Sequence, residues 1–304
     1  MRRAMIGLSV LLFLAMVAIA ADKKEYDLKL KFTKGEKLYY KCDTKGSRKS
    51  LNTNEESQET SIIEHEVNDV SEDGTSSLVM KILKIVQKSD KGEYDSEKGK
   101  KTVPKERADM LDSLLEKQLK AKVAPNGELK ETEGEKEIAE EIIKGMGDNQ
   151  MLKMMPREMV QKMIEETVKT SFGMLFFSFL PKEKVTVGKT WQFEQKQPLI
   201  KLIWEAKLKS VKKEKDKEIA EIEMTLKDVV LEAGDNPMMG GMVEVEKNYT
   251  GSGKAKFNIS DGRTTLIEMN SQYGLKNKMT NASVSSQNTS LKAELLKEPP
   301  KIGK

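Results

Sequence analysis

The sequence predicts an α+β protein in which long, curved antiparallel β-sheets carry a central helical insert packed on the sheet. Three observations predict this fold. Apolar and polar residues alternate through both ends of the chain, strand and turn signals recur twice in the same order, and helical periodicity appears between the two copies. The copies would form a duplicated half-barrel or a partly open barrel, and the sequence leaves open whether they make one barrel or two separate sheets.

Alternation with a period of two residues is typical of strands that bury one face and leave the other in water. Leu28, Leu30 and Phe32 alternate with lysines, and the same pattern covers residues 220–227 and 249–259. These segments therefore predict amphipathic antiparallel strands.

Four segments of the first copy match four segments of the second copy. A glycine followed by aromatic residues opens each copy, at Gly35 and Gly188, and an Asn-Gly or Asp-Gly pair closes each, at Gly127 and Gly262. Such pairs are strong hairpin signals, because both central positions of a type I′ turn need positive φ. The matched segments are 35–40 with 188–193, 63–70 with 204–211, 78–86 with 222–230, and 121–127 with 255–262.

Between the copies, apolar residues recur with the spacing of a helix face. One stripe follows Pro104, a second runs from Ile138 to Met146, and a third begins at Pro156. The organisation that these patterns predict is a signal peptide over residues 1–20, a β-rich half with one helix over 21–133, a helical insert over 134–184, a second β-rich half over 185–293 and a disordered tail over 294–304.

The first twenty residues have the three regions of a secretory signal peptide. Arg2 and Arg3 precede an apolar run over residues 6–19, which at about 14 residues is shorter than the ~20 that cross a bilayer as a helix. We expect cleavage after Ala20 or Ala21, where the residues are small, rather than a retained membrane anchor. The mature protein would then lie in the periplasm or outside the cell, with no transmembrane segment.

Charge is plentiful but not segregated. The chain has 53 Lys and Arg and 49 Asp and Glu, which gives a formal net charge of +4. Lysines and glutamates alternate along the sequence and form no basic stripe of the kind that follows phosphates. We therefore expect no nucleic-acid partner, and the sequence does not identify a protein partner.

Catalytic and metal chemistry has few candidates. His65 is the only histidine and Cys42 the only cysteine, and both fall in strand-like stretches. One His and one Cys cannot fill the four positions of a zinc site, and no nucleophile motif brackets them. We therefore expect no enzyme, no catalytic residue, no cofactor and no metal site.

Methionine is unusually frequent, with 18 residues, many of them in the helical middle. Flexible thioether side chains fill cores or line adaptable apolar grooves. The ligand-lining residues that we expect from this region are Met155, Met159, Met163, Phe176 and Phe177. Because methionine sulfur also binds Cu(I), copper binding through the Met cluster is an alternative interpretation.

At the repeated starts, Lys34 to Tyr40 and Val185 to Trp191, and at the two glycine turns, the chain resembles an uncharacterised family of exported bacterial proteins of unknown function. The resemblance covers most of residues 25–290, and its motifs are structural. More remotely, a long antiparallel sheet with helices on one face is similar to the half-barrel of periplasmic lipoprotein carriers of the LolA and LppX kind. That resemblance implies a hydrophobic cavity between the sheet and the helices.

The leading functional hypothesis is a non-enzymatic extracytoplasmic protein that binds or carries a lipid or another hydrophobic ligand between the sheet and the Met-rich helices. A structural or envelope-interaction protein with a filled core is the alternative from a different class, and copper binding is a third.

Overall fold

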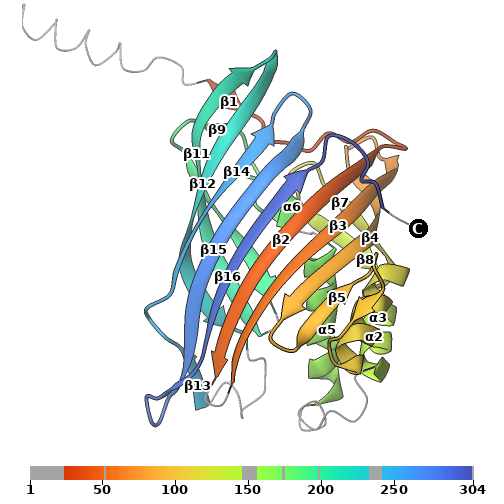
Figure 1. The fold of residues 1–304 in the computed structure, drawn as a ribbon. Coiled ribbons are helices and arrows are strands. Elements are labelled where there is room, and N and C mark those ends of the chain that lie inside the picture. Colours follow the sequence, from red (N-terminus) through yellow and green to blue (C-terminus); the bar gives the residue numbers. More distant parts are fainter. Residues whose placement is uncertain are drawn as a thin grey trace, which may run out of the picture.

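The computed structural model describes residues 24–50, 53–145, 156–172, 175–197, 199–232 and 242–302. Its main feature is one curved antiparallel sheet, which has 14 strands among the described residues (Figure 1). The predicted signal peptide, Met155 and most of the other methionines of the central cluster lie outside the described residues. The predicted α+β class with long antiparallel strands is confirmed, and the sheet is open rather than closed into a barrel.

The first half of the sheet is the order β2-β3-β4, after which β4 pairs with both β5 and β7 along different parts of its length. Its last pairs are β5 with β6 and β7 with β8. The strands of this half are β2 (Lys37–Ser50), β3 (Asn54–Val70), β4 (Ser76–Ser89), β5 (Gly92–Asp95), β6 (Lys100–Lys101), β7 (Gln118–Val123) and β8 (Leu129–Glu133).

The second half is the order β10-β11-β12-β14-β15-β16, with the short β13 beside β15. A separate pair joins β1 (Glu25–Tyr26) to β9 (Val185–Thr186). The strands of the second half are β10 (Thr190–Gln197), β11 (Ile200–Glu214), β12 (Lys217–Leu231), β13 (Val243–Val245), β14 (Thr250–Asn258), β15 (Arg263–Asn277) and β16 (Ser283–Leu295).

The two halves match strand by strand, β2-β3-β4-β7-β8 with β10-β11-β12-β14-β15. Tyr40 pairs with Ile63 in the first half, and the repeat partners of these residues, Phe193 and Trp204, pair in the second. Both halves have β-bulges at the corresponding places, including the one at Lys122/Val123 in the first half and at Lys256/Phe257 in the second. Since bulges fix the local register, the repeat extends to backbone geometry.

One strand joins the halves into a continuous sheet. β16 pairs with β15 on one side and with β2 on the other. Its last residues, Glu294 and Leu295, pair with Lys41 and Tyr40, so the ordered structure runs past residue 293, where the sequence predicts a disordered tail. The predicted tail begins too early in the sequence, because Glu294 and Leu295 pair with β2, which is far away in sequence.

The helices gather beside β4 and within the curve of the sheet (Figure 1). α2 packs against β4 and α3, and α3 packs against α5. Inside the curve, Phe176 stacks on Tyr40 with ring centroids 4.0 Å apart, and His65 contacts Phe176 and Phe177. The helices are α2 (Lys105–Glu116), α3 (Glu135–Gly145), α5 (Arg157–Ser171) and α6 (Leu175–Ser178).

Residues 24–34 run across the end of the sheet where both repeats have their closing turns. The Leu30 amide donates to the carbonyl of Pro125 (2.7 Å), and the Lys31 amide donates to the carbonyl of Gly262 (3.1 Å). One segment therefore holds the turns of both halves while it buries Leu28 and Leu30 in the core.

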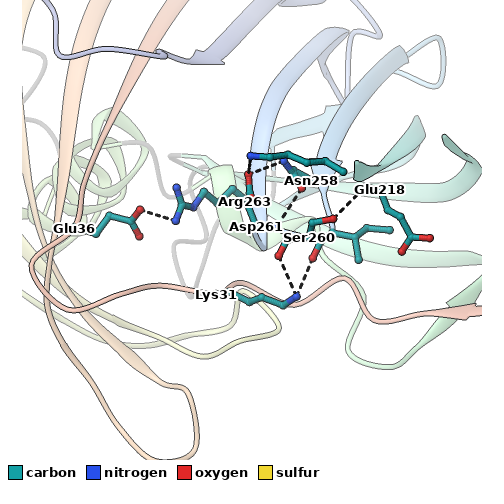
Figure 2. A network of polar contacts seen from close by, with 9 residues as sticks. Lys31, Glu36, Glu218, Asn258, Ser260, Asp261 and Arg263 are labelled. Atoms are coloured by element: carbon teal, nitrogen blue, oxygen red, sulfur yellow. Dashed lines mark hydrogen bonds and ion pairs between the residues drawn. The ribbon is translucent and has the colours of Figure 1, made fainter. Parts of the chain in front are cut away.

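A polar network surrounds the second of these turns (Figure 2). The Lys31 ammonium donates to the carbonyls of Ile259 and Ser260, and the Ser260 hydroxyl accepts from the Glu218 amide. Beside them, the Arg263 guanidinium lies 2.5 Å from the Glu36 carboxylate, and both side chains are mostly buried. This ion pair joins the segment before β2 to the first residue of β15.

Replacing Gly127 by alanine is expected to destabilise the fold more than the same change at Gly35. Both glycines have a φ of +81°, which alone costs an alanine about 1 kcal/mol. A Cβ at Gly127 would lie 2.0 Å from the Phe177 carbonyl oxygen, whereas a Cβ at Gly35 meets nothing within 4 Å. We expect Gly127→Ala to lose at least ~2 kcal/mol more than Gly35→Ala in urea unfolding followed by tryptophan fluorescence. Equal losses would contradict the close packing of this turn on α6.

Candidate functional site

A cavity of about 260 Å³ lies between the first half of the sheet and the helices. Its floor comes from β3 and β4 and its roof from α2, α3 and α5. The lining residues are Glu59, Ser61, Ile82, Ile85, Arg107, Met110, Leu111, Leu114, Ile142, Ile164, Thr167, Val168 and Ser171. The space is therefore where the sequence predicts a ligand site, between sheet and helices.

The local periodicity of each element explains the apolar lining. On α2, residues three and four apart share a face, which places Met110, Leu111 and Leu114 toward the sheet. On β4, Ile82 and Ile85 both face the helices, because a register shift between β3 and β4 inserts one residue between them. Apart from Glu59, Arg107 and the hydroxyl groups of Ser61 and α5, the side chains of the walls are apolar.

Three polar side chains stand at one end of the cavity. The Arg107 Nε donates to the Gln87 amide oxygen (2.8 Å), and the Gln87 amide donates to Glu59 (3.2 Å). The Arg107 and Glu59 charges themselves are 3.7 Å apart at their closest, and Arg107 Nη1 contacts the Met110 sulfur at 3.4 Å. The guanidinium has five N–H donors, more than these contacts use.

Burial shifts the pKa values of the two charged residues in this group, Glu59 and Arg107. Burial raises the pKa of the Glu59 carboxyl above its usual value, and Arg107 opposes that shift. Burial likewise lowers the pKa of the Arg107 guanidinium, and Glu59 opposes it. Each charge is thus only partly compensated by the other, so an additional polar group placed here would find a donor and an acceptor already oriented.

A second hollow of about 520 Å³ adjoins the cavity, since Gln87 and Arg107 line it and Arg107 lines both. Most of its other lining residues are polar, including Arg48, Ser57 and Gln287, beside Val103 and Pro104. Arg107 therefore separates an apolar chamber from a polar one.

The residues expected to line a ligand site are not gathered at this cavity. Met159 and Met163 are half-buried on α5 but do not line the cavity. The residues of α5 that line it are Ile164 and others further along the helix. Phe176 and Phe177 are 3% and 1% exposed and are packed in the aromatic core around His65. A ligand role for these side chains stays a prediction, and so does copper binding through the Met cluster.

The only histidine and cysteine are placed for packing. His65 is fully buried, its Nε2 lies 3.1 Å from the Phe172 carbonyl, and burial lowers its pKa to about 4. Burial raises the pKa of Cys42 to about 12, and a hydrogen bond with Ser61 opposes that shift. Near neutral pH the imidazole is uncharged and the thiol protonated, so neither is an activated group.

Two observations concern only the part of the chain that the structure describes. There, no group of three or more His, Cys, Asp or Glu side chains is arranged to hold a metal ion. Among the same residues, no helix is both long and apolar enough to cross a membrane.

Residues 73–267 match the model of a protein family described as a family of unknown function (DUF6263). The chain belongs to this family. The match covers more than half of the sequence and reaches from the turn before β4 into β15, so it includes parts of both halves of the DUF6263 sheet. The predicted resemblance to an uncharacterised family is therefore confirmed. No curated protein matches the chain.

Solved structures resemble the chain only weakly. Lipovitellin, in a structure described as "lipid-protein interactions in lipovitellin", matches with a TM-score of 0.49 and 9% identity over 90% of this chain and 26% of that one. DynF of the dynemicin pathway of Micromonospora chersina matches with a TM-score of 0.20 and 5% identity over 90% of this chain and 85% of that one. Pseudomonas aeruginosa OccK5 matches with a TM-score of 0.21 and 8% identity over 86% of this chain and 97% of that one. The DUF6263 chain thus spans about a quarter of the lipovitellin chain, and these scores carry no functional argument.

Sequence reasoning missed the polar group formed by Glu59, Gln87 and Arg107. A signal was present, because Glu59 and Gln87 occupy strand positions that continue the inward-facing series of Ile63 and Ile85. A polar residue at an inward position needs a partner, and Gln87 is only 5% exposed. Without the position of α2, the sequence could not show that the partner was Arg107.

The buried imidazole predicts a specific pH dependence of stability. Because the folded pKa of His65 is about 4 and its ordinary value is 6.5, the unfolded chain binds the proton first as pH falls. His65 therefore supports full stability above pH 6.5, and that stability is lost as pH falls toward 4, by about 3 kcal/mol. Urea unfolding between pH 7 and pH 4 measures this loss.

His65→Gln provides the comparison, since it removes the only imidazole and leaves every carboxylate. The variant should lose less free energy of unfolding than the wild-type protein over the same pH interval. Two curves that stay parallel from pH 7 to pH 4 would show that His65 is not held neutral by the core.

Proposed function

We propose that the protein is a non-enzymatic extracytoplasmic protein that binds or carries a hydrophobic ligand beneath its helices. One observation supports this most directly: side chains of the sheet and three helices enclose about 260 Å³ of largely apolar space with a polar group at one end. Apolar chambers with a few convergent polar groups are the usual form of small-molecule sites.

The dimensions and chemistry favour a small amphiphile. The cavity volume of about 260 Å³ is slightly below the ~300–1,000 Å³ range of ligand pockets, which suits one short acyl chain or a ring system rather than a two-chain lipid. A carboxylate head would lie against Arg107, where N–H donors remain, and a hydroxyl head would accept from Gln87 or donate to Glu59.

A structural or envelope-interaction role with a filled core is the competing proposal. It is favoured by the packing inside the curve, where Tyr40, His65 and Phe176 contact one another closely. The two proposals differ in what they require of the cavity under α2. Ligand binding requires that the cavity accept a molecule, whereas a structural role does not need the cavity.

Export is part of the proposal and rests on the leader-like residues 1–20. Expression of the full chain with intact mass measurement of the product tests it. The expected product begins at Ala21 or Asp22 and is found outside the cytoplasm. A full-length product in the cytosol would contradict export without bearing on ligand binding.

Ile164→Trp is expected to weaken ligand binding at least about tenfold, because the larger ring enters the cavity from α5. Arg107→Gln should weaken binding of an anionic amphiphile about five- to tenfold while leaving a neutral one nearly unchanged. Titration with anilinonaphthalene sulfonate and with a short-chain fatty alcohol as competitor measures both effects, and mass spectrometry of solvent extracts identifies any ligand that co-purifies.

Val187→Trp is the matched control, since Val187 is 43% exposed and does not line the cavity. It should bind the probe as the wild-type protein does. Failure of the wild-type protein to bind either class of amphiphile, or equal binding by Ile164→Trp, would favour the filled-core alternative.

A further inference from the structure

The edge of β10 is a second feature that the ligand cavity does not involve. Among the described strands, β10 pairs with β11 alone, so one side of its backbone has no strand partner. A groove of about 880 Å³ runs along it, bounded on the other side by the β7–β8 turn and by Glu166, Lys169 and Thr170 of α5. An open strand edge is a ready template for pairing with another chain.

The lining shows that the groove follows the edge of β10 rather than one face of it. A hollow on one face of a strand would contact every second residue, because successive side chains point to opposite sides. Here every residue from Lys189 to Lys196 lines the groove. The backbone between those side chains is therefore what the groove exposes.

The register shows which backbone groups are free. The Gly188 amide donates to the Leu208 carbonyl, and the Leu208 amide donates to the Lys189 carbonyl, so Leu208 faces β10 with both groups. Because hydrogen-bonded and non-hydrogen-bonded pairs alternate along the two strands, the backbone amides and carbonyls of Trp191 and Phe193 point toward β11. Those of Gln192 and Glu194 point toward the groove. Their amides and carbonyls are available to an added strand.

The internal repeat shows that this edge accepts a strand elsewhere in the same molecule. β10 is the counterpart of β2, and the β2 edge that corresponds to the free edge of β10 is covered by β16 over Tyr40 to Ser50. Between β8 and β10 the chain supplies helices in place of a second β16. The groove along β10 overlaps the corresponding position from Phe193, the repeat partner of Tyr40, to Lys196.

Charge indicates the kind of strand that fits. Four glutamates line the groove, of which Glu128, Glu166 and Glu194 are paired with lysines, whereas Glu183 has no ion pair among the described residues. Five lysines line it, of which Lys169 is paired with Glu166 and the other four have no ion pair among the described residues. The four are Lys182, Lys184, Lys189 and Lys196. Pairing β10 with β10 of a second copy would bring two lysine-lined grooves together, which like charge opposes.

We propose that β10 binds an extended, acidic segment of another protein, which adds to the sheet as a strand in this groove. Main-chain hydrogen bonds to Gln192 and Glu194 supply affinity, and the lysines select acidic side chains. Apolar side chains of the segment lie against Leu129, Leu180 and Trp191. This interaction is independent of the cavity beneath the helices.

The test uses the mature protein and a fluorescein-labelled peptide of about ten residues that alternates glutamate with valine and threonine. Gln192→Pro removes an outward-facing amide from β10 and should weaken binding at least about tenfold. Gln192→Ala removes the same exposed side chain but keeps the amide, and should bind within about twofold of the wild-type protein. Lys184→Glu with Lys189→Glu should weaken binding about fivefold or more, and a lysine-for-glutamate peptide should bind poorly.

A second arm places the change on the peptide, in case Gln192→Pro fails to fold. A peptide N-methylated at alternate residues keeps its side chains but cannot pair along one edge, and it should lose binding to the wild-type protein. Hydrogen exchange at Gln192 and Glu194 should slow when the unmodified peptide is bound. The proposal would be overturned if the unmodified peptide did not bind, or if Gln192→Pro bound it as well as the wild-type protein does. It would also be overturned if the wild-type protein formed a dimer that Gln192→Pro dissociates.

Discussion

An open sheet with one apolar face must be covered by the rest of its own chain, and this constraint organises the molecule. Burial of apolar surface is the main favourable term in folding, so each uncovered stretch costs stability. Residues 24–34, α6 and the three longer helices provide the cover. His65 of the sheet becomes almost inaccessible beneath it, as do Leu28 and Phe176 of the covering segments themselves. The cavity and the groove along β10 are two places in the described part of the chain where the cover is incomplete, and the two proposed interactions use them.

The two copies of the repeat show how one scaffold acquires different surfaces. They share register, bulges and positive-φ glycines, so the chain uses similar backbone geometry twice. They differ in the segment after the last matched strand, because β15 leads into β16 whereas β8 leads into helices. At one junction Glu36 and Arg263 form an ion pair, whereas their repeat partners, Lys189 and Glu128, line an open groove.

Much of the fold was predictable because its signals are local. Alternation identified the inward residues of the strands, and Gly127 and Gly262 marked turns that need positive φ. The pairing of β16 with β2 had no such signal, since it joins residues more than 200 positions apart whose match depends on the whole sheet. The candidate site was harder still: Arg107 gains its role only from the packing of α2 against β4, and methionine abundance drew attention to α5 instead.

The state of the buried polar groups indicates what such an interior can accept. His65 stays neutral and Cys42 stays protonated because the core solvates charge poorly. The charges nearest the cavity, Arg107 and Glu59, both keep part of their side chains exposed, and Arg107 also lines the hollow on the outer side. A molecule that entered from that side would leave its polar end among Arg107, Gln87 and water and place its apolar part in the cavity, which is why the ligand proposed above is an amphiphile.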